Sequence, residues 1–328
     1  PQGRELAFEL MAQADIVVEN NRPGVMERLG LGYEALSARN PGLVMVRISG
    51  FGQDGPYAGQ PGYGAICEAV GGVRHMTGDP DRPPARVALA TTDYLSSVYA
   101  AFGAMAAIHA RQHTGKGQVV DVALYETAFT QMEPIVPAYD KLGTVPKREG
   151  PNLPRMAPNS LYPTRDGGYV LIAANSNPTF ERLIRLMGRE DLMQDERFST
   201  MSARTAHIDT LYQELAQCVA GQTTAYWIEA CGRLDIPAAP LRRLVDLEDD
   251  EHLKQTGFFI SLRDPAMGLI RMPNAPLKFD GASPSPTLPP RLGQHTLEVL
   301  RGAGLPEDTL AAMLETRAAV QYNEGDKP

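Results

Sequence analysis

The sequence predicts an α/β protein in which a large Rossmann-like domain with a parallel sheet is joined to a smaller α+β domain. Short runs of β-branched residues alternate with helical segments near the start, which is typical of parallel strands joined by helices. A segment rich in Pro, Gly and Asn at 141–168 indicates the crossover between domains. We therefore expect a large domain at 1–145, a smaller one at 146–280, and a C-terminal return to the large domain at 281–328.

Two buried strands are expected first, at 14–19 and 43–49, because both segments are short, apolar and rich in β-branched residues. Between them, Pro23 suits the first position of a helix, which predicts a short helix at 25–29. A second helix is expected over 33–39, where Pro41 ends it. Strand, helices and strand in this order predict a parallel layer.

Two glycine-containing segments resemble nucleotide-binding motifs and are rejected as such. Residues 50–55 match GxGxxG after a strand, but prolines and glycines through 64 prevent a helix from opening there. Residues 113–117, HTGKG, lack the first glycine and the Ser or Thr of a P-loop. The glycines at 50–64 instead indicate a backbone that passes close to another segment or to a ligand.

The stretch from Thr91 to Leu124 is the centre of the large domain in this interpretation. Its apolar positions recur on one helical stripe, and glycines at 115 and 117 end the helix before a strand at 119–124. Thr92 and Asp93 are suited to cap the start of this helix. The apolar stripe comprises Leu95, Val98, Phe102, Met105 and Ile108.

Asp93 has two interpretations that its pattern does not separate. An aspartate at the start of a helix is commonly a structural cap. It is also a candidate nucleophile, because a helix N-terminus favours the ionised carboxylate and offers N–H groups to a nearby oxyanion.

The second half predicts a strand at 168–174, helices at 177–187 and 205–220, and a helix that Thr223 caps and that ends near 234. Two short amphipathic helices are expected within 292–314. Helices with short strands indicate the smaller α+β domain.

Composition excludes several classes of protein. The net charge is −8 with no long basic run, so nucleic acid is not an expected partner. Three scattered cysteines indicate a reducing compartment, and no His/Cys cluster has metal-ligand spacing, so no metal is expected. There is no run of about 18 apolar residues and no signal peptide, so we expect a cytoplasmic protein without a membrane partner.

Several segments together resemble one family, the class III CoA-transferases of the CaiB/BaiF, formyl-CoA/carnitine type. No single motif is specific, but their combination and order span nearly the whole chain. The segments are ADIVVENNRPGVMERLGLGYEAL, NPGLVMVRISGFGQDGPYAGQPGYG, TTDYLSSVYAAFGAMAAIHARQHTGKGQVVDVALYE, MAPNSLYPTRDGGYVLIAANSN, DERFSTMSAR and LGQHTLEVL.

The resemblance implies an enzyme that transfers CoA from an acyl-CoA donor, with succinyl-CoA as a candidate, to a carboxylic acid. It implies an interlocked homodimer, a CoA-binding large domain, and Asp93 as the residue that forms a mixed anhydride and then a thioester with CoA. A carboxylate is ionised at neutral pH, so this chemistry requires positioning and oxyanion stabilisation and no general base.

For CoA, the resemblance assigns contacts to the turn after the first strand. Asn20, Asn21, Arg22 and Arg28 are the candidates, and Arg28 suits phosphate because its guanidinium can bind bidentately. An aromatic residue is usual in the family where this chain has Asn21. As an alternative, Arg28 is a solvated helix residue.

The loop at 50–64 is expected to border the pantetheine arm and the acyl pocket. Gly50, Phe51, Pro61 and Tyr63 are the candidate contacts. Tyr63 either hydrogen-bonds the acyl group or packs as a structural residue.

Two arginines are candidates for binding a distal carboxylate. The stretches MAPNSLYPT and AANSN resemble family members that move CoA from succinyl-CoA to dicarboxylic or branched acids. Arg74 and Arg155 are the candidates, with solvated surface arginines as the alternative.

Family members begin with a further strand and helix, so we expect the chain to lack a front segment. Two alternative functions remain open: an α-methylacyl-CoA racemase and an inactive CoA-binding relative. The racemases of the family carry a His-Asp pair where this chain has Tyr63 and Gly64.

Overall fold

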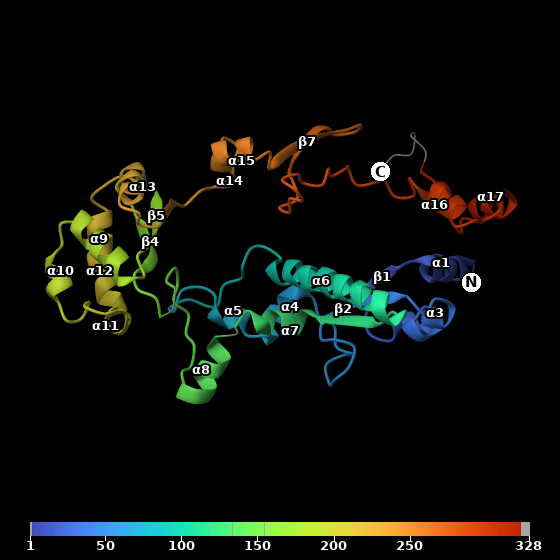
Figure 1. The fold of residues 1–328 in the computed structure, drawn as a ribbon, viewed down its shortest axis with the longest axis horizontal. Helices are drawn as coiled ribbons and strands as arrows, with labels where there is room; N and C mark the ends of the chain where they lie inside the picture. Colours follow the sequence, from blue (N-terminus) through green and yellow to red (C-terminus); the bar gives the residue numbers. More distant parts are fainter. Residues whose placement is uncertain (1, 133, 154, 323–328) are drawn as a thin grey trace. The chain divides into compact units, whose positions relative to one another are not determined.

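The computed structural model describes residues 2–132, 134–153 and 155–322. The chain divides into two compact units (Figure 1). The first comprises Pro1–Arg148 with Pro289–Pro328, and the second comprises Glu149–Leu288. The fold is mixed α/β with a parallel sheet, as the sequence predicted.

A parallel sheet of three strands, in the order β1-β2-β3, forms the centre of the first unit. Glu19, Arg47 and Asp121 are aligned across the three strands, close to their carboxyl ends. Because parallel strands end at one edge of a sheet, the loops that follow them lie side by side. The strands are β1 (Ile16–Glu19), β2 (Val44–Ser49) and β3 (Val119–Ala123).

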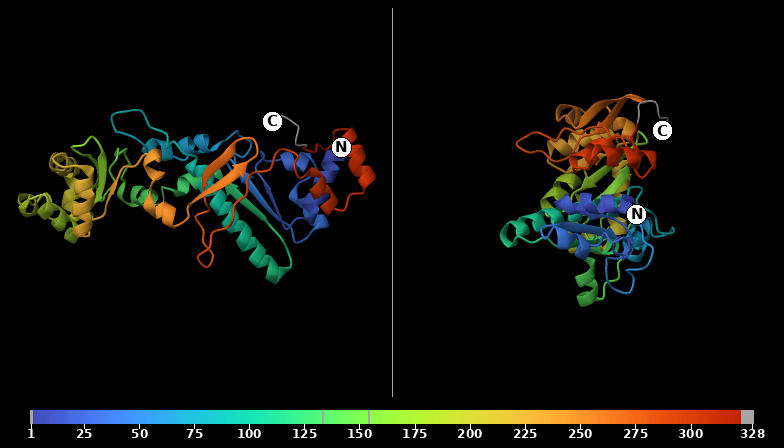
Figure 2. Two further views of the ribbon diagram at one scale, coloured as in Figure 1. Left: turned by 90° about the horizontal axis from the view of Figure 1, so that it is seen from above. Right: turned by 90° about the vertical axis from the view of Figure 1, so that its right-hand side faces the viewer.

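Helices cover both faces of this sheet, because successive residues of each strand point to opposite faces. Val44 and Val46 of β2 pack against alanines of α6 (Thr91–Thr114). Met45, between them, packs with Leu36 of α3 (Tyr33–Arg39) and with residues of α1 (Gln2–Gln13). Figure 2 shows the long α6 beside the strands. A strand buried on both faces explains the continuous apolar run in the sequence.

Helix α6 begins two residues earlier than predicted. Ala90 is its N-cap residue, so Thr91, Thr92 and Asp93 form its first turn, and the prediction that Thr92 and Asp93 cap it is wrong. Thr92 is fully buried beneath this turn, whereas Asp93 is exposed. The helix therefore presents the Asp93 side chain to solvent at its positive end.

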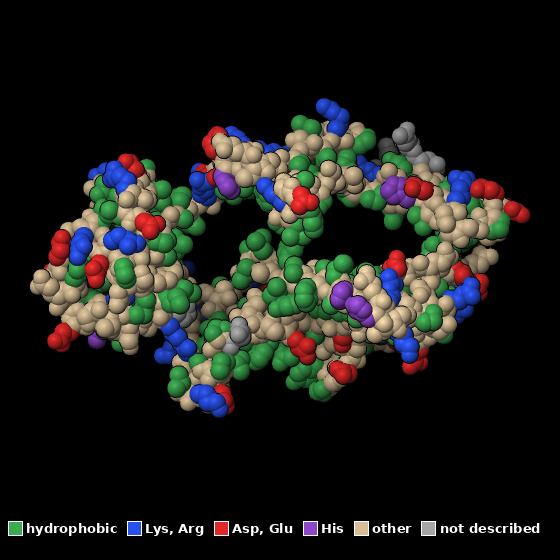
Figure 3. Space-filling view, viewed as in Figure 1, with side chains coloured by type: hydrophobic (Ala, Val, Ile, Leu, Met, Phe, Trp, Pro, Cys, Tyr) green, Lys and Arg blue, Asp and Glu red, His purple; other side chains and the backbone are tan. Residues whose placement is uncertain are grey.

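Small residues, and not the large apolar ones, form the face of α6 that packs on the sheet. Its buried residues are Thr92, Ser96, Ala100, Ala104 and Ala107. Large apolar side chains on the opposite side remain exposed, among them Phe102, which is 73% exposed. Hydrophobic side chains gather over this helix in Figure 3. The exposed set comprises Tyr94, Val98, Tyr99, Phe102 and Met105, and is called the α6 apolar face below.

Short helices complete the first unit. Gly24, and not Pro23, directly precedes the helix after β1, because Gly24 adopts a left-handed conformation (φ 81°) as its N-cap. The helices are α2 (Val25–Arg28), α4 (Gly64–Val70), α5 (Val73–Met76), α7 (Leu124–Thr130), α8 (Ile135–Leu142), α16 (Thr296–Gly302) and α17 (Glu307–Glu315).

The second unit has its own core around an antiparallel sheet in the order β4-β5-β6. The predicted helix at 205–220 is in fact two helices that meet at His207. Its elements are β4 (Asn159–Pro163), β5 (Tyr169–Ala173), α9 (Asn177–Leu186), α10 (Asp191–Gln194), α11 (Met201–Ala206), α12 (Ile208–Val219), α13 (Thr224–Arg233), β6 (Ala238–Pro240), α14 (Leu244–Leu247), α15 (Glu251–Gln255), and the hairpin β7 (Phe259–Asp264) and β8 (Gly268–Pro273).

Arg204 of α11 is fully buried in the second unit and holds three chain segments together. It donates hydrogen bonds to the carbonyls of Ala157, Phe198 and Asn175 and to Oδ1 of Asn177. Its guanidinium also lies over the ring of Phe180, 4.4 Å from the centroid. Burial lowers its pKa. Within the described part of the chain, no helix has both the length and the apolar character needed to cross a membrane.

Candidate active site

The candidate site residues of the first unit lie at the carboxyl edge of the parallel sheet and on the helix starts beside it. Asn20, Asn21 and Arg22 directly follow β1, and Gly50 and Phe51 directly follow β2. Ligands of open α/β sheets bind at this edge, because loops and helix starts meet there. The sequence therefore placed its candidates at the edge where such a fold binds ligands.

The turn after β1 is shaped by one buried carboxylate and one glycine. The backbone N–H of Asn21 donates to Oε2 of Glu19 at 2.7 Å. Arg28 reaches back over the turn, so that a Cβ added at Gly24 would lie 3.2 Å from its Nη1. The asparagine side chains and Arg22 are exposed. The turn and the helix after it thus carry two exposed arginines and two exposed amides, a set that suits phosphate groups.

Arg47 of β2 supports this turn from beneath. Its Nε donates to Oε1 of Glu19 at 2.7 Å, and its Nη1 donates to Oε1 of Glu27 at 2.8 Å. The side chains of Arg47 and Glu19 are only 9% and 4% exposed, whereas that of Glu27 is 48% exposed. The hydrogen bond from Arg47 lowers the pKa of Glu27. Sequence analysis missed this network, whose signal is an arginine inside an otherwise apolar strand.

The turn after β2 depends on a close approach between two glycines. A Cβ added at Gly50 would lie 2.9 Å from the Cα of Gly62, closer than two non-bonded carbon atoms approach in folded proteins. A residue with a side chain would therefore clash at position 50. The Gly50 carbonyl accepts hydrogen bonds from the Tyr125 backbone N–H at 2.9 Å and from the Cys67 thiol at 3.2 Å. Phe51 is buried and packs edge-on against Tyr57 at 5.7 Å. Its packing supports the loop, and its contact with CoA stays a prediction.

The carboxylate of Asp93 rests on Gly64, the first residue of α4. A Cβ added at Gly64 would overlap the Asp93 carboxylate group. The carboxylate therefore occupies the space that any other residue at position 64 would fill. Sequence analysis did not anticipate this contact, because the two residues are far apart in the chain and a lone glycine carries no pattern.

Two further residues of α4 lie close to Asp93. The Cys67 thiol is fully buried, and its pKa is raised to about 11, chiefly by burial and also by the negative charges of Asp93 and Glu68. The thiol thus stays protonated at neutral pH and is not a competing nucleophile. Glu68 is itself buried, at 4% exposure.

Two more of the predicted contacts lie on the loop that leads into α4. Tyr63 is the N-cap residue of α4 and is 77% exposed, so its ring does not pack in the core of the first unit. Pro61 is also exposed. Both therefore stand beside Gly64, where the Asp93 carboxylate rests.

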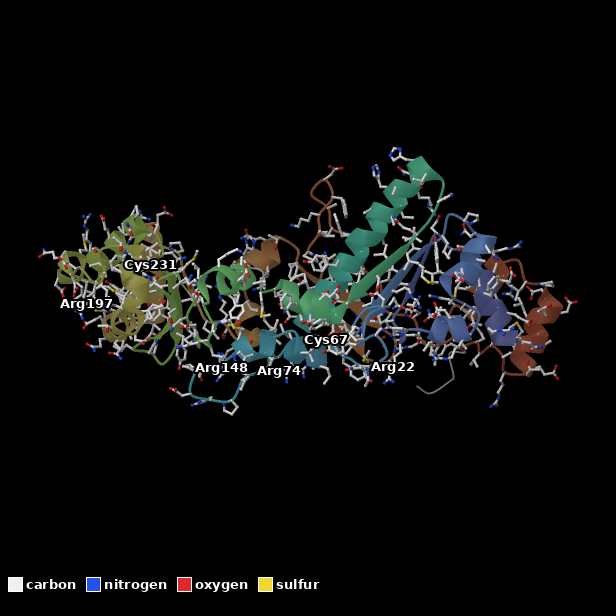
Figure 4. The ribbon with its side chains drawn as sticks, turned by 90° about the horizontal axis from the view of Figure 1, so that it is seen from below. Arg22, Cys67, Arg74, Arg148, Arg197 and Cys231 are labelled. Atoms are coloured by element: carbon white, nitrogen blue, oxygen red, sulfur yellow. The ribbon has the colours of Figure 1, made fainter. Side chains whose placement is uncertain are left out.

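The two predicted arginines fall in different units. Arg74 belongs to α5, which directly follows α4, the helix that carries Cys67 (Figure 4). Arg155 belongs to the second unit and is exposed, with a left-handed backbone (φ 64°). Arg74 alone therefore shares a unit with Asp93.

An exposed carboxylate on a glycine floor, at the first turn of a long helix, suits attack on a planar carbonyl group. The helix end favours the negative charge, and the glycine leaves room for the carboxylate to take this position. No group of three or more His, Cys, Asp or Glu among the described residues is arranged to hold a metal ion. The fold and this carboxylate together are those expected of an α/β enzyme with a carboxylate nucleophile.

Comparison with known proteins establishes the family. The model of CoA-transferase family III matches residues 1–296, and the chain belongs to this family. It is accordingly a CoA-transferase of class III. The expected resemblance is confirmed.

Relatives of known activity agree with this assignment. The chain is 40% identical over 323 residues to the succinyl-CoA–D-citramalate CoA-transferase of Chloroflexus aurantiacus, covering 98% of this chain and 80% of the relative. It is 35% identical to the succinyl-CoA–L-malate CoA-transferase beta subunit of the same organism, covering 92% and 75%. A crystal structure of a CaiB/BaiF family protein from Brucella suis matches with a TM-score of 0.78 and 32% identity, covering 92% of this chain and 79% of that one.

Proposed function

We propose that this enzyme transfers CoA from succinyl-CoA to a second carboxylic acid, with Asp93 as the covalent catalyst. The observation that carries the proposal is the exposed Asp93 carboxylate held over Gly64 at the start of α6. Two relatives named for succinyl-CoA as donor support the choice of donor.

In the first step, a carboxylate oxygen of Asp93 attacks the thioester carbonyl carbon. The carbon–sulfur bond breaks, CoA leaves as a thiolate, and a mixed anhydride forms. The thiolate then attacks the aspartyl carbonyl, which releases succinate and leaves CoA bound to Asp93 as a thioester. No net proton is taken up or released, so the chemistry requires positioning and no general base.

In the second half, the carboxylate of the acceptor acid attacks the aspartyl thioester. CoA leaves again as a thiolate and attacks the acceptor carbonyl of the new anhydride. This regenerates the Asp93 carboxylate and releases the product acyl-CoA. Each step passes through a tetrahedral oxyanion, which N–H groups near a helix start are suited to stabilise.

For CoA binding, we propose the turn Asn20–Gly24 and Arg28 as the phosphate-binding part. Arg22 and Arg28 supply the charge, and the amides of Asn20 and Asn21 supply neutral donors. Gly50, Phe51, Pro61 and Tyr63 border the path from this turn to Asp93. The close approach of Gly50 to Gly62 and the contact of Gly64 with the Asp93 carboxylate support this path.

The racemase alternative is less well supported. A racemase needs an acid and a base on either side of the α-carbon. At positions 63 and 64 this chain has a tyrosine and a glycine, and the Asp93 carboxylate fills the space of a side chain at position 64. A transferase needs neither partner, since a carboxylate is the nucleophile.

We also propose that the enzyme is an interlocked homodimer and acts in the cytoplasm. The α6 apolar face supports a dimer, because contiguous apolar surface of this kind marks an interface in water. The occupant that fits it is a second copy of the chain, as the family resemblance implies.

The function is tested by covalent trapping. The enzyme is incubated with succinyl-CoA, and the CoA adduct is located by mass spectrometry of peptides. We expect the adduct on Asp93 alone, with transfer abolished in Asp93→Ala and nearly so in Asp93→Asn. Glu126→Gln, an acidic residue on α7, serves as the matched control. A label on another residue would refute the role of Asp93.

A further inference from the structure

A partly buried ion pair between α4 and α5 has no part in the chemistry described above. Arg74 Nη2 lies 3.6 Å from Oε2 of Glu68, beyond hydrogen-bonding distance. Arg74 Nε and Nη2 are buried atoms, and neither has a hydrogen-bond partner among the described residues. Buried donors are almost always paired in folded proteins, so Glu68 holds this guanidinium in place without satisfying its hydrogen bonds.

This pair lies about one helical turn from the nucleophile. Gly64 and Glu68 are four residues apart on α4, so they share a face, with Cβ positions roughly 5–6 Å apart. The Asp93 carboxylate occupies the Cβ position of Gly64. The Cys67 thiol lies near both carboxylates, because the charges of Asp93 and Glu68 each raise its pKa. The distance suits the short chain between the two carbonyl carbons of a small diacid.

One edge of the Arg74 guanidinium is buried, and the rest of the side chain is partly exposed. The edge with Nε and Nη2 is buried, and Glu68 faces Nη2, but the side chain as a whole is 31% exposed. An arginine with a carboxylate behind it is held in one orientation and can present its remaining donors to a ligand. Nη1 is not one of the buried donors, so it can donate a charge-assisted hydrogen bond to a ligand carboxylate.

Helix α5, which carries Arg74, is only four residues long and is fixed by a neighbour. The guanidinium of Arg148 donates hydrogen bonds to the carbonyl of His75, which follows Arg74 in α5, and to those of Asp79, Pro80 and Arg82 in the next loop. Figure 4 shows Arg148 and Arg74 along the same edge of the unit. The loop is thereby held in place, and a site on rigid support binds its ligand at lower entropic cost.

We propose that Arg74 binds the distal carboxylate of the acyl group carried by Asp93, with Glu68 as the residue that orients Arg74. The acyl groups transferred are then those of dicarboxylic acids. This inference rests on the proposed function. Once Asp93 is acylated its negative charge is lost, so the distal carboxylate meets Arg74 without repulsion from the nucleophile.

The test compares two donors of equal chain length. Succinyl-CoA carries a distal carboxylate, and butyryl-CoA has a methyl group in its place. Formation of the covalent enzyme–CoA adduct is followed by intact-mass spectrometry in single turnovers, which gives a rate for each donor. The selectivity is the ratio of the two rates.

We expect Arg74→Ala to slow the reaction of succinyl-CoA about 100-fold, as the loss of a charged hydrogen bond implies, and to leave butyryl-CoA within about threefold. Arg74→Lys keeps the charge without the planar fork, so its loss with succinyl-CoA is about tenfold. Glu68→Gln keeps the shape of the pair and lowers the selectivity in the same direction. Arg82→Ala removes an exposed arginine of the same loop and leaves the selectivity unchanged.

The experiment distinguishes a failure of the proposed function from a failure of the role assigned to Arg74. If the wild-type enzyme forms no adduct with either donor, the proposed function is wrong. If it forms the adduct but Arg74→Lys and Arg74→Ala slow both donors equally, or neither, the role of Arg74 is wrong and the function stands. A wild-type enzyme that uses butyryl-CoA as well as succinyl-CoA overturns the inference too.

Discussion

The contact between Asp93 and Gly64 is the residue-scale feature on which the candidate site depends. Aspartate at a helix start is common, and its pattern alone indicates a structural role. In the structure it makes no capping hydrogen bond, and its carboxylate lies over a position with no side chain. A carboxylate that is exposed, and not engaged in capping, remains available for attack on a substrate.

Replacing Gly64 by alanine tests this contact. The added methyl group overlaps the Asp93 carboxylate and displaces it, and a displacement of about 1 Å at a reacting group costs roughly 100-fold in rate. We expect Gly64→Ala to lower kcat by that order, with little change in the affinity for CoA. Transfer kinetics and CoA binding by calorimetry measure the two effects.

Gly59→Ala is the matched control, because no atom lies within 4 Å of a Cβ added there. Combining Gly64→Ala with Asp93→Ala removes the overlap, so the melting temperature of the double variant should equal that of Asp93→Ala or exceed it. If Gly64→Ala is as active as Gly59→Ala, the steric argument is wrong.

At the scale of elements, the first unit is organised by three strands whose carboxyl ends carry charge. Arg47 joins Glu19 of β1 to Glu27 of α2, and the backbone N–H of Gln53 donates to Asp121 of β3 at 2.8 Å. These bonds fix the loops that begin at this edge. The sheet therefore positions the turn at Asn20–Gly24, which is proposed to bind CoA, through a buried ion pair as well as through its backbone.

Removing Arg47 is expected to leave Glu19 buried without a partner. Loss of one member of a buried pair costs about 3–5 kcal/mol, whereas loss of an exposed pair costs about 1 kcal/mol or less. We expect Arg47→Met to lower the opening free energy of β1 and β2 by that larger amount. Hydrogen exchange of peptides from these strands, read by mass spectrometry, measures it.

Arg301→Met, which breaks an exposed pair with Glu307 in the same unit, provides the comparison. Equal protection of the strands in the two variants would contradict a structural role for Arg47. Glu19→Leu combined with Arg47→Met removes both charges and should restore part of the lost protection.

At the scale of the whole molecule, the orientation of α6 has the largest consequence. Its alanine face packs on the sheet, so its large apolar side chains point outward. Burying such side chains stabilises by roughly 1.5–3 kcal/mol each, which is available to an association and is not used within the first unit. This supports the proposed homodimer.

A charge in the middle of the α6 apolar face should prevent that association. Phe102 is 73% exposed, and glutamate at this position would bury a charge in the interface. We expect a wild-type dimer by analytical ultracentrifugation and a monomer for Phe102→Glu. Gln112→Glu, on the same helix, adds the same charge outside the apolar face and should remain dimeric. A monomeric wild-type enzyme would contradict the proposal.

Much of the first unit follows from local patterns. The strands at 16–19 and 44–49 and the helix at 33–39 were predicted within two residues, because hydrophobic runs and proline positions mark them directly. The helix over 205–220 was not, since nothing in its apolar spacing marks the break at His207. The domain spans and the roles of the site residues stay predictions.

The sequence by itself determined the parallel α/β layer and the family, and made Asp93 the candidate nucleophile, because strand and helix periodicity and ordered motifs are local properties of the chain. Only the tertiary structure decided that Asp93 lies over Gly64 and that Glu68 lies against the guanidinium of Arg74. It also decided which face of α6 packs on the sheet. These contacts join residues whose spacing carries no signal. They depend on how the helices pack. The alanine face of α6, and not the face with larger apolar residues, lies on the sheet because small side chains let the helix approach it closely.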